Sequence, residues 1–221
     1  MKTDGWGDAV IIAIDGPAAS GKGTIAKRLA THYGFPHLDS GLLYRGVGMA
    51  VLSGGFSPDD QAAAIAAAEA YEPGRFPEDD LKSDEVAKAA SIVAAIPEVR
   101  AALIALQHNF AKSEPGAVID GRDIGTVIAP QAEVKIYVTA TAEERAGRRV
   151  RELRGRGGEV DEAAVLADIR ARDDRDMNRA VAPLKPADDA ILLDTTNLGI
   201  DASVRAAIEI VEAVRAGRRP A

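Results

Sequence analysis

The sequence predicts an α/β fold in which helices flank a parallel sheet. Two observations support this prediction: short apolar runs alternate with longer helical segments, and the apolar runs are continuous rather than alternating. Alternation of strands and helices is typical of a parallel sheet with helical crossovers on its faces. A strand covered on both faces has no solvent side, so its apolar residues follow one another. The 221 residues suffice for one such domain.

Five runs are expected to form the sheet. The first is "AVIIAID" at residues 9–15, a candidate for a fully buried strand, and the weakest is "FPHLD" at 35–39. Runs similar to the first are "AVID" at 117–120, "VKIYVTA" at 134–140 and "AILLDTT" at 190–196. The segment 201–217 is expected to be a helix with one face on the sheet, because apolar residues recur there at helical spacing. These residues are Ile200, Val204, Ile208, Val211 and Val214.

The segment 56–84 differs in composition and is expected to form a peripheral arm. It contains an alanine-rich helical stretch at 61–71, and then a stretch with two prolines and little to bury. We assign the arm to residues 56–112, a lid region to 148–180, and the core to 8–55, 115–145 and 188–221. Together these parts form one domain.

Composition limits the classes of function. The formal net charge is -7, and hydrophobic and charged residues make up 47% and 28% of the chain, as in an ordinary globular protein. An acidic chain does not suit duplex DNA, which proteins hold through lysine and arginine. The chain has no cysteine, and residues 1–16 contain no apolar run long enough for a signal peptide or a membrane span. We therefore expect a cytoplasmic protein without nucleic-acid or membrane partners.

A phosphate-binding loop follows the first predicted strand and precedes a helix. In this setting glycines allow backbone N–H groups to turn around phosphate oxygens, and the helix N-terminus adds partial positive charge. The strict pattern has Ser or Thr directly after the lysine, whereas this chain has glycine there and threonine one position later. The usual Mg²⁺ contact is then expected to pass through water or a carboxylate. The loop consists of Gly16, Pro17, Ala18, Ala19, Ser20, Gly21, Lys22, Gly23 and Thr24.

The motif "LDSGLLYR" follows the second predicted strand. Its Asp39 or Ser40 is expected to cap the next helix. Ser40 is also a candidate ligand of a phosphate or ribose, with Arg45 about one and a half turns later. Ligands bind at the carboxyl edge of an open α/β sheet, which is where both this motif and the phosphate loop leave the strands.

The motif "AVIDGRDIGT" follows the third predicted strand. Asp120 ends the strand, in the manner of the acidic residue that holds Mg²⁺ in phosphate-loop enzymes. Arg122 and Asp123 then offer one cation and one carboxylate. This pair suits a nucleotide base that has both hydrogen-bond acceptors and an amino group as donor. The structural alternative is a turn closed by an ion pair.

The motif "IRARDDRDMNR" at residues 169–179 is rich in arginine. If it is helical, Arg172, Arg175 and Arg179 lie at i, i+3 and i+7 in one stripe, with Asp176 between them. Three cations on one face repel one another unless an anion lies opposite. Together with "ERAGRRVRELRGRG" upstream, they suit a lid that stabilises phosphoryl transfer. The structural alternative is a solvated helix face.

Taken together, these motifs resemble those of one enzyme family. "IDGPAASGKGT", "LDSGLLYR", "DGRDIGT" and "RDDRDMNRAVAPL" occur in the same order in bacterial cytidylate kinases, or (d)CMP kinases, and the resemblance covers most of the chain. It implies a P-loop nucleoside monophosphate kinase fold with a five-stranded parallel core, a reduced monophosphate-binding arm and a short lid. It also implies a monomer that transfers the γ-phosphoryl group of MgATP in line to CMP or dCMP, with Mg²⁺ as the metal.

The resemblance further implies a role for each candidate residue. The catalytic residues are expected to be Lys22, Arg122, Arg175 and Arg179. ATP is expected to lie on Gly16–Thr24 with Arg148 nearby, and either Asp39 or Asp120 lies nearer Mg²⁺, directly or through water. Ser91, Arg100 and Asp123 are expected to read the cytosine ring. The full set of substrate-binding residues is Ser40, Arg45, Ser91, Arg100, Arg122, Asp123, Arg172, Asp176 and Arg179.

The chain also departs from the family pattern. The arm before Ser91 is short and lacks the β-rich insertion of many bacterial members, and Met177 stands where another basic residue is common. A kinase for another acceptor, such as UMP or AMP, is the alternative, because a few polar groups decide base selectivity. A GTPase needs an Asn-Lys-x-Asp motif after a late strand, and "LLDTTNLG" does not supply it. The negative net charge of the chain disfavours a nucleic-acid-dependent ATPase.

Overall fold

The protein is built on a five-stranded sheet, seen here in a computed structural model that describes residues 10–155, 157 and 159–218. The strand order is β2–β3–β1–β4–β5, and each neighbouring pair is parallel. All five predicted strands are present; residues 8 and 9 of the expected core lie outside the described residues. The strands are β1 (Val10–Asp15), β2 (His37–Asp39), β3 (Gly116–Gly121), β4 (Val134–Thr139) and β5 (Ile191–Asp194).

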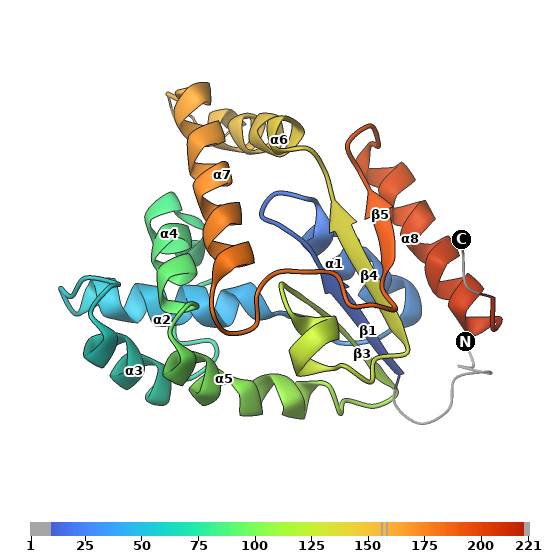
Figure 1. The fold of residues 1–221 in the computed structure, drawn as a ribbon, viewed down its shortest axis with the longest axis horizontal. Helices are drawn as coiled ribbons and strands as arrows, with labels where there is room; N and C mark the ends of the chain where they lie inside the picture. Colours follow the sequence, from blue (N-terminus) through green and yellow to red (C-terminus); the bar gives the residue numbers. More distant parts are fainter. Residues whose placement is uncertain (1–9, 156, 158, 219–221) are drawn as a thin grey trace.

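Helices connect the strands and cover the sheet (Figure 1). Those that contribute to the two cores around β1 are α1 (Lys22–Tyr33), α5 (Pro97–Phe110), the single turn η2 (Ile124–Ile128) and α8 (Ile200–Arg215). The others are α2 (Ser40–Ser53), which follows β2 directly and contacts β3, α3 (Gln61–Glu69), the short η1 (Asp80–Lys82), α4 (Asp84–Val93), α6 (Ala142–Gly155) and α7 (Glu162–Asn178).

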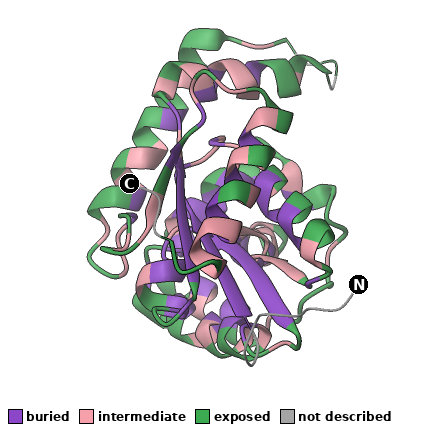
Figure 2. Cartoon of the chain, turned by 90° about the vertical axis from the view of Figure 1, so that its right-hand side faces the viewer, coloured by how far each residue is buried: buried purple, intermediate pink, exposed green. Residues whose placement is uncertain are grey.

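The central strand β1 shows why the sheet is covered on both faces. Ile12 and Ile14 pack into one core with α1 and α8, while Ile11 and Ala13 pack into another with η2 and the end of α5. All six β1 residues are buried, as the continuous apolar run predicts. Figure 2 shows the strands of the sheet as the buried centre of the molecule.

Two expectations at the far edge of the sheet are wrong. β5 is an edge strand rather than a fully buried one, with Leu193 buried and Leu192 64% exposed. Ile200 was expected on the sheet face of the last helix but is 63% exposed, because it is the first residue of α8. Val204, Ile208 and the rest of the apolar stripe do pack against the sheet core.

The regular secondary structure of the predicted arm consists of helices, which are joined by loops. Helices α3, α4 and α5 pack with α2 around a second core that includes Val47, Val93 and Leu103. No strand occurs between residues 56 and 112, all of which the structure describes. Helix α5 begins at Pro97, where the missing N–H of proline costs no hydrogen bond.

The described ranges contain no single helix that is long and apolar enough to cross a membrane. Helices α4 and α5 satisfy the length and composition criteria only when taken together, across a bend of 101°. Both contribute buried side chains to the second core.

Helices α6 and α7 pack against each other, and α7 also contacts α4 of the arm. In Figure 1, α7 descends between the arm helices and the sheet. The expected lid region, 148–180, covers most of both helices, although α6 begins at Ala142 and residues 156 and 158 are not described.

Candidate active site

The phosphate loop joins β1 to α1 at the carboxyl edge of the sheet. Gly16 has a φ of +154°, and a Cβ there would lie 2.0 Å from the Val138 carbonyl oxygen, so no other residue fits. Gly21 precedes the helix with a φ of +89°. The Ser20 hydroxyl is buried and has no hydrogen-bond partner among the described residues. A tight loop with a free hydroxyl before a helix N-terminus suits an anionic ligand.

Lys22 is the first residue of α1. Burial, and then the positive charge of Arg122, lower the pKa of Lys22 to about 8. The carboxylates of Asp120 and Asp39 act in the opposite direction. An anion bound in the loop would favour the charged ammonium form.

Two arginines of α6 hold the backbone of the phosphate loop. Arg148, the predicted ATP-side residue, donates through Nη1 to the Ser20 carbonyl oxygen at 3.1 Å and also bonds Thr195. Arg145 donates to the Ala18 carbonyl oxygen at 3.2 Å and forms an ion pair with Asp173 of α7. Sequence reasoning did not select Arg145, because "ERAGRR" does not show which of its arginines turns inward.

The two candidate metal carboxylates lie on neighbouring strands. Asp39 and Asp120 are register partners across β2 and β3. Asp39 caps α2, with Oδ1 accepting from the Gly41 N–H at 2.9 Å, which settles the choice of cap. Burial, and then the neighbouring charge of Asp120, raise the pKa of Asp39. Asp120 Oδ1 lies 2.7 Å from His37 Nε2.

The residue types fit a divalent cation that also binds substrate. The described residues contain no cluster of three or more His, Cys, Asp and Glu side chains that could enclose a metal ion by itself. Mg²⁺ characteristically uses one or two carboxylates and completes its shell with water and substrate phosphates. Asp39 and Asp120 supply such carboxylates close to Lys22.

A polar cavity lies close to Lys22, because, besides burial, the charges of two of its lining residues, Arg122 and Arg172, lower the pKa of Lys22. Eight of the nine predicted substrate-binding residues line it, all except Arg45. They come from α2, α4, α5, α7, the residue that follows α7, and the loop after β3, so residues far apart in sequence meet here. The full lining is Ser40, Gly41, Tyr44, Ala90, Ser91, Ala94, Arg100, Gly121, Arg122, Asp123, Arg172, Asp176 and Arg179.

Two carboxylates organise the cations of this cavity. Asp123 forms ion pairs with Arg100 and with Arg179, the latter at 3.3 Å from Nη2 to Oδ1. Asp176 accepts from Arg122 Nε at 2.9 Å, and Arg172 Nε lies 3.9 Å away. Four guanidinium groups thus share two carboxylates.

The excess of positive charge points to an anionic ligand. Burial, and then the charge of Arg122, lower the pKa of Arg172 to about 9. Arg172 Nε and Arg100 Nη1 are buried and lack hydrogen-bond partners among the described residues. Buried donors without partners are costly, and a bound phosphate or base would satisfy them.

The cavity also contains an aromatic residue that sequence reasoning missed. The Tyr44 ring lies under the Arg100 guanidinium, with Cζ 5.6 Å from the ring centroid. The "LDSGLLYR" motif contains this tyrosine, but only the folded helix α2 shows that it faces the arginine.

Arg45 and Arg175 lie outside this cavity. Arg45 donates to the Leu81 carbonyl oxygen at 2.6 Å. Arg175 donates through Nε to Ser91 Oγ at 3.3 Å and lines a separate cavity of about 320 Å³ against Ile96 and Pro97.

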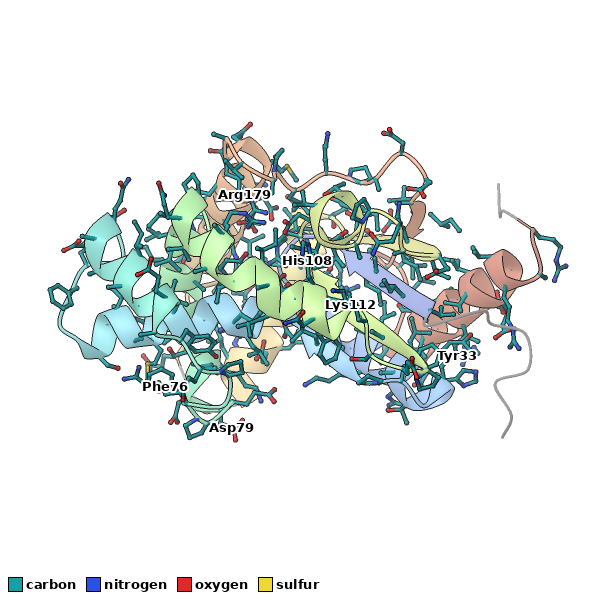
Figure 3. All side chains as sticks on the ribbon, turned by 90° about the horizontal axis from the view of Figure 1, so that it is seen from below. Tyr33, Phe76, Asp79, His108, Lys112 and Arg179 are labelled. Carbon is teal, nitrogen blue, oxygen red and sulfur yellow. The ribbon has the colours of Figure 1, made fainter. Side chains whose placement is uncertain are left out.

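The expected single stripe of arginines is therefore wrong. Helix α7 ends at Asn178, and Arg179 follows it in an extended conformation, donating through Nε to the Ala182 carbonyl oxygen at 2.6 Å. Arg172 and Arg179 reach the polar cavity from opposite sides of this break, while Arg175 faces the arm. Met177 is 46% exposed. Figure 3 labels Arg179 well away from Phe76 and Asp79 of the arm.

A parallel sheet with a phosphate loop after its first strand, and an arginine-lined cavity beside it, defines a P-loop kinase. Two solved structures share this fold at low identity. An uncharacterized protein from Eubacterium ventriosum ATCC 27560 is 20% identical with a TM-score of 0.52, covering 93% of this chain and 99% of its own. A gluconokinase from Sinorhizobium meliloti 1021 is 13% identical with a TM-score of 0.50, covering 95% and 94%.

The chain belongs to the cytidylate kinase family, whose model matches residues 12–213. A cytidylate kinase from Bradyrhizobium sp. (strain ORS 278) is 61% identical over 210 residues, covering 95% of this chain and 99% of the relative. Cytidylate kinases from Rhodopseudomonas palustris (strain HaA2) and Methylocella silvestris are 60% and 61% identical over 95% and 92% of this chain. The protein is thus a nucleotide kinase, as its motifs predict.

Proposed function

We propose that the protein phosphorylates CMP and dCMP to CDP and dCDP by direct transfer of the γ-phosphoryl group of ATP. The observation that supports this most strongly is the cavity beside the phosphate loop, where four arginines share two carboxylates. Such a cavity suits a small anion with a polar base. Family membership supports the same acceptor.

ATP would bind on the phosphate loop. Lys22, at the start of α1, would stabilise the transferring phosphoryl group, and the free Ser20 hydroxyl and the loop amides would contact the phosphates. Arg148 and Arg145 would shape this site by holding the loop carbonyls. Mg²⁺, carried by Asp39 or Asp120 through water or directly, would supply further charge neutralisation.

CMP would bind in the polar cavity. Asp123, held between Arg100 and Arg179, would present a carboxylate to the amino group of cytosine. Ser91 lines the same cavity and donates through Oγ to Asp176 Oδ1 at 3.4 Å. Arg122 and Arg172 would face the acceptor phosphate, which leaves Asp176 to orient them. Arg45 and Arg175 contribute to these proposed contacts only if the arm and α7 move.

We propose that the arm or α7 moves when the nucleotide binds. The polar cavity has a volume of about 50 Å³, whereas small-molecule sites typically measure roughly 300–1,000 Å³. Because α4 and α7 both line it, their separation would admit the nucleotide. Reclosure would then exclude water, which otherwise accepts the phosphoryl group.

Catalysis in this proposal consists of positioning and charge neutralisation. The acceptor phosphate is already an anion, so no general base is required, and no covalent intermediate forms. The arginines of the cavity and Lys22 hold two polyanions together and stabilise the charge that spreads over the transferring oxygens.

The test is to measure ADP formation from MgATP with CMP, dCMP, UMP, AMP and GMP in turn. We expect rapid turnover with CMP and dCMP and much slower turnover with the others. Preference for UMP or AMP would favour the alternative acceptor, and hydrolysis that does not depend on any acceptor would contradict a kinase of this type.

A cytoplasmic location and a monomeric state are likewise proposals. Sedimentation of the purified protein tests the second, and fractionation of cells that express the chain tests the first.

A further inference from the structure

One buried carboxylate outside the candidate site joins its two halves. Asp15 is the last residue of β1, directly before Gly16 of the phosphate loop, and is 5% exposed. Its Oδ1 accepts a hydrogen bond from the Ile124 N–H at 2.8 Å, and its Oδ2 accepts one from the Gly125 N–H at 2.7 Å. These two amides open η2, immediately after Asp123.

This contact begins where the sheet ends. The pairing of β1 with β3 stops at Asp15 and Gly121, so the following residues are not held by the strand ladder. Arg122 and Asp123 lie in that stretch. The hydrogen bonds that Asp15 accepts from the Ile124 and Gly125 N–H groups hold this stretch at two points. They fix its position relative to Gly16, the first residue of the phosphate loop.

A negative charge at this position has a cost. Burial raises the pKa of Asp15 to about 6, and the carboxylate lies next to a loop built for polyanions. Each carboxylate oxygen here accepts from a different N–H donor, and only a carboxylate presents two acceptor oxygens in this arrangement. An asparagine of the same size could accept from one amide and would turn its own NH₂ group toward the other.

We propose that Asp15 is a positioning residue that aligns the acceptor-binding residues Arg122 and Asp123 with the phosphate loop. It touches neither substrate. It acts through the backbone of residues 124 and 125, so that the acceptor phosphate and the γ-phosphate meet in line. The inference rests on the proposed function, because alignment matters only if two nucleotides react.

Misalignment has a distinct chemical signature. Displacement of a reacting group by about 1 Å lowers the rate of transfer by roughly 100-fold. The γ-phosphoryl group can then pass to water, giving ADP and inorganic phosphate instead of ADP and CDP. A variant that merely lost folded protein would make fewer products but would keep one CDP for each ADP.

The matched substitutions are Asp15→Asn and Glu133→Gln. The Glu133 carboxylate also accepts a hydrogen bond from β1, from the Ile11 N–H at 2.7 Å. Glu133 lies directly before β4, at the amino ends of the strands, whereas Asp15 lies at their carboxyl ends. Glu133→Gln thus removes a carboxylate bound to the same strand without touching the two loops. It should keep wild-type kinetics whatever it does to stability.

The experiment measures ADP and CDP separately in the complete reaction with MgATP and CMP. We expect Asp15→Asn to raise the ADP-to-CDP ratio at least twofold, to lower the kcat for CDP at least tenfold, and to raise the KM for CMP more than the KM for ATP. Glu133→Gln should keep a ratio of one.

A folded Asp15→Asn protein with a ratio of one and unchanged KM values would overturn the proposal, even if its melting temperature fell. If that variant does not fold, Asp15→Ser tests the same contact, because a single hydroxyl cannot replace the two carboxylate oxygens that accept from the Ile124 and Gly125 N–H groups. One CDP for each ADP in a folded Asp15→Ser protein, with unchanged KM values, would then overturn the proposal. If the wild-type protein makes no CDP from MgATP and CMP, the proposed function itself is contradicted.

Discussion

Arg122 Nε lies 2.9 Å from Asp176 Oδ2, and this ion pair joins the loop after β3 to α7. Both side chains are nearly buried, with exposed fractions of 15% and 6%. The pair therefore connects the sheet edge to the helix that covers the candidate acceptor site, and its partners are 54 residues apart in sequence.

Asp176→Asn should weaken acceptor binding. The substitution removes the charge that orients Arg122 and Arg172, and buried charge-assisted hydrogen bonds contribute about 1.5–3 kcal/mol. We expect kcat/KM for CMP to fall roughly 10- to 100-fold. Asp174→Asn is the control, because Asp174 is exposed on the same helix and bonds Asn178. Equal kinetics of the two variants would contradict this role for Asp176.

Lys22→Ala should abolish most of the turnover. Removing the single ammonium at the start of α1 would lower kcat by about 100- to 1,000-fold, as losses of comparable transition-state donors do. Lys27→Ala serves as the control, since Lys27 forms an exposed ion pair with Glu78. Near-normal turnover of Lys22→Ala would remove Lys22 from the mechanism.

Asp123→Ala should reduce base selectivity. Asp123 is the carboxylate between Arg100 and Arg179, and without it neither an acceptor for the cytosine amino group nor a fixed pair of guanidinium groups remains. The ratio of kcat/KM for CMP to that for UMP should fall at least tenfold. If this ratio is unchanged, Asp123 does not read the base.

Substitution of the two strand-end carboxylates should reveal which lies nearer the metal. Chelation of Mg²⁺ should stop turnover of the wild type. Asp39→Asn and Asp120→Asn should each be titrated with Mg²⁺, and the residue nearer the metal should show the larger increase in the half-saturating concentration. Identical titrations for both variants and the wild type would exclude both residues.

Turnover should depend on the charge of Lys22 in alkaline solution. Burial, and then Arg122, lower the pKa of Lys22 to about 8, so the free enzyme loses this charge as the pH rises through 8. Loss of the cation weakens phosphate binding, and kcat/KM for ATP should therefore decline above pH 8. In Lys22→Arg this limb should disappear or move upward by at least one pH unit. An unchanged limb in that variant would assign it to another group.

The sheet was predictable because β1, β3 and β4 are buried on both faces, which leaves continuous apolar runs in the sequence. The exposure of Leu192 was not predictable, since an apolar run does not show whether its strand lies at the edge. The helix pattern around Arg172 indicated a charged face, but nothing local showed that the helix stops before Arg179.

The residues that came together in the candidate site were identified by motif rather than by physical reasoning about distance. Asp15 shows that local sequence does not predict contacts between residues far apart in the chain. Its partners are 109 and 110 residues away, and "VIIAIDG" reads as an ordinary strand end. Arg145 and Tyr44 were missed for the same reason: their importance depends on the tertiary contacts that the fold creates.

The most direct test of the central claim follows the γ-phosphoryl group itself. Wild-type protein is incubated with Mg²⁺, ATP labelled in the γ-phosphate, and CMP, and the label is traced to each product. We predict that the label appears in the β-phosphate of CDP, with one CDP for each ADP and no labelled protein. Label that appears only in inorganic phosphate, at the same rate with and without CMP, would contradict the account.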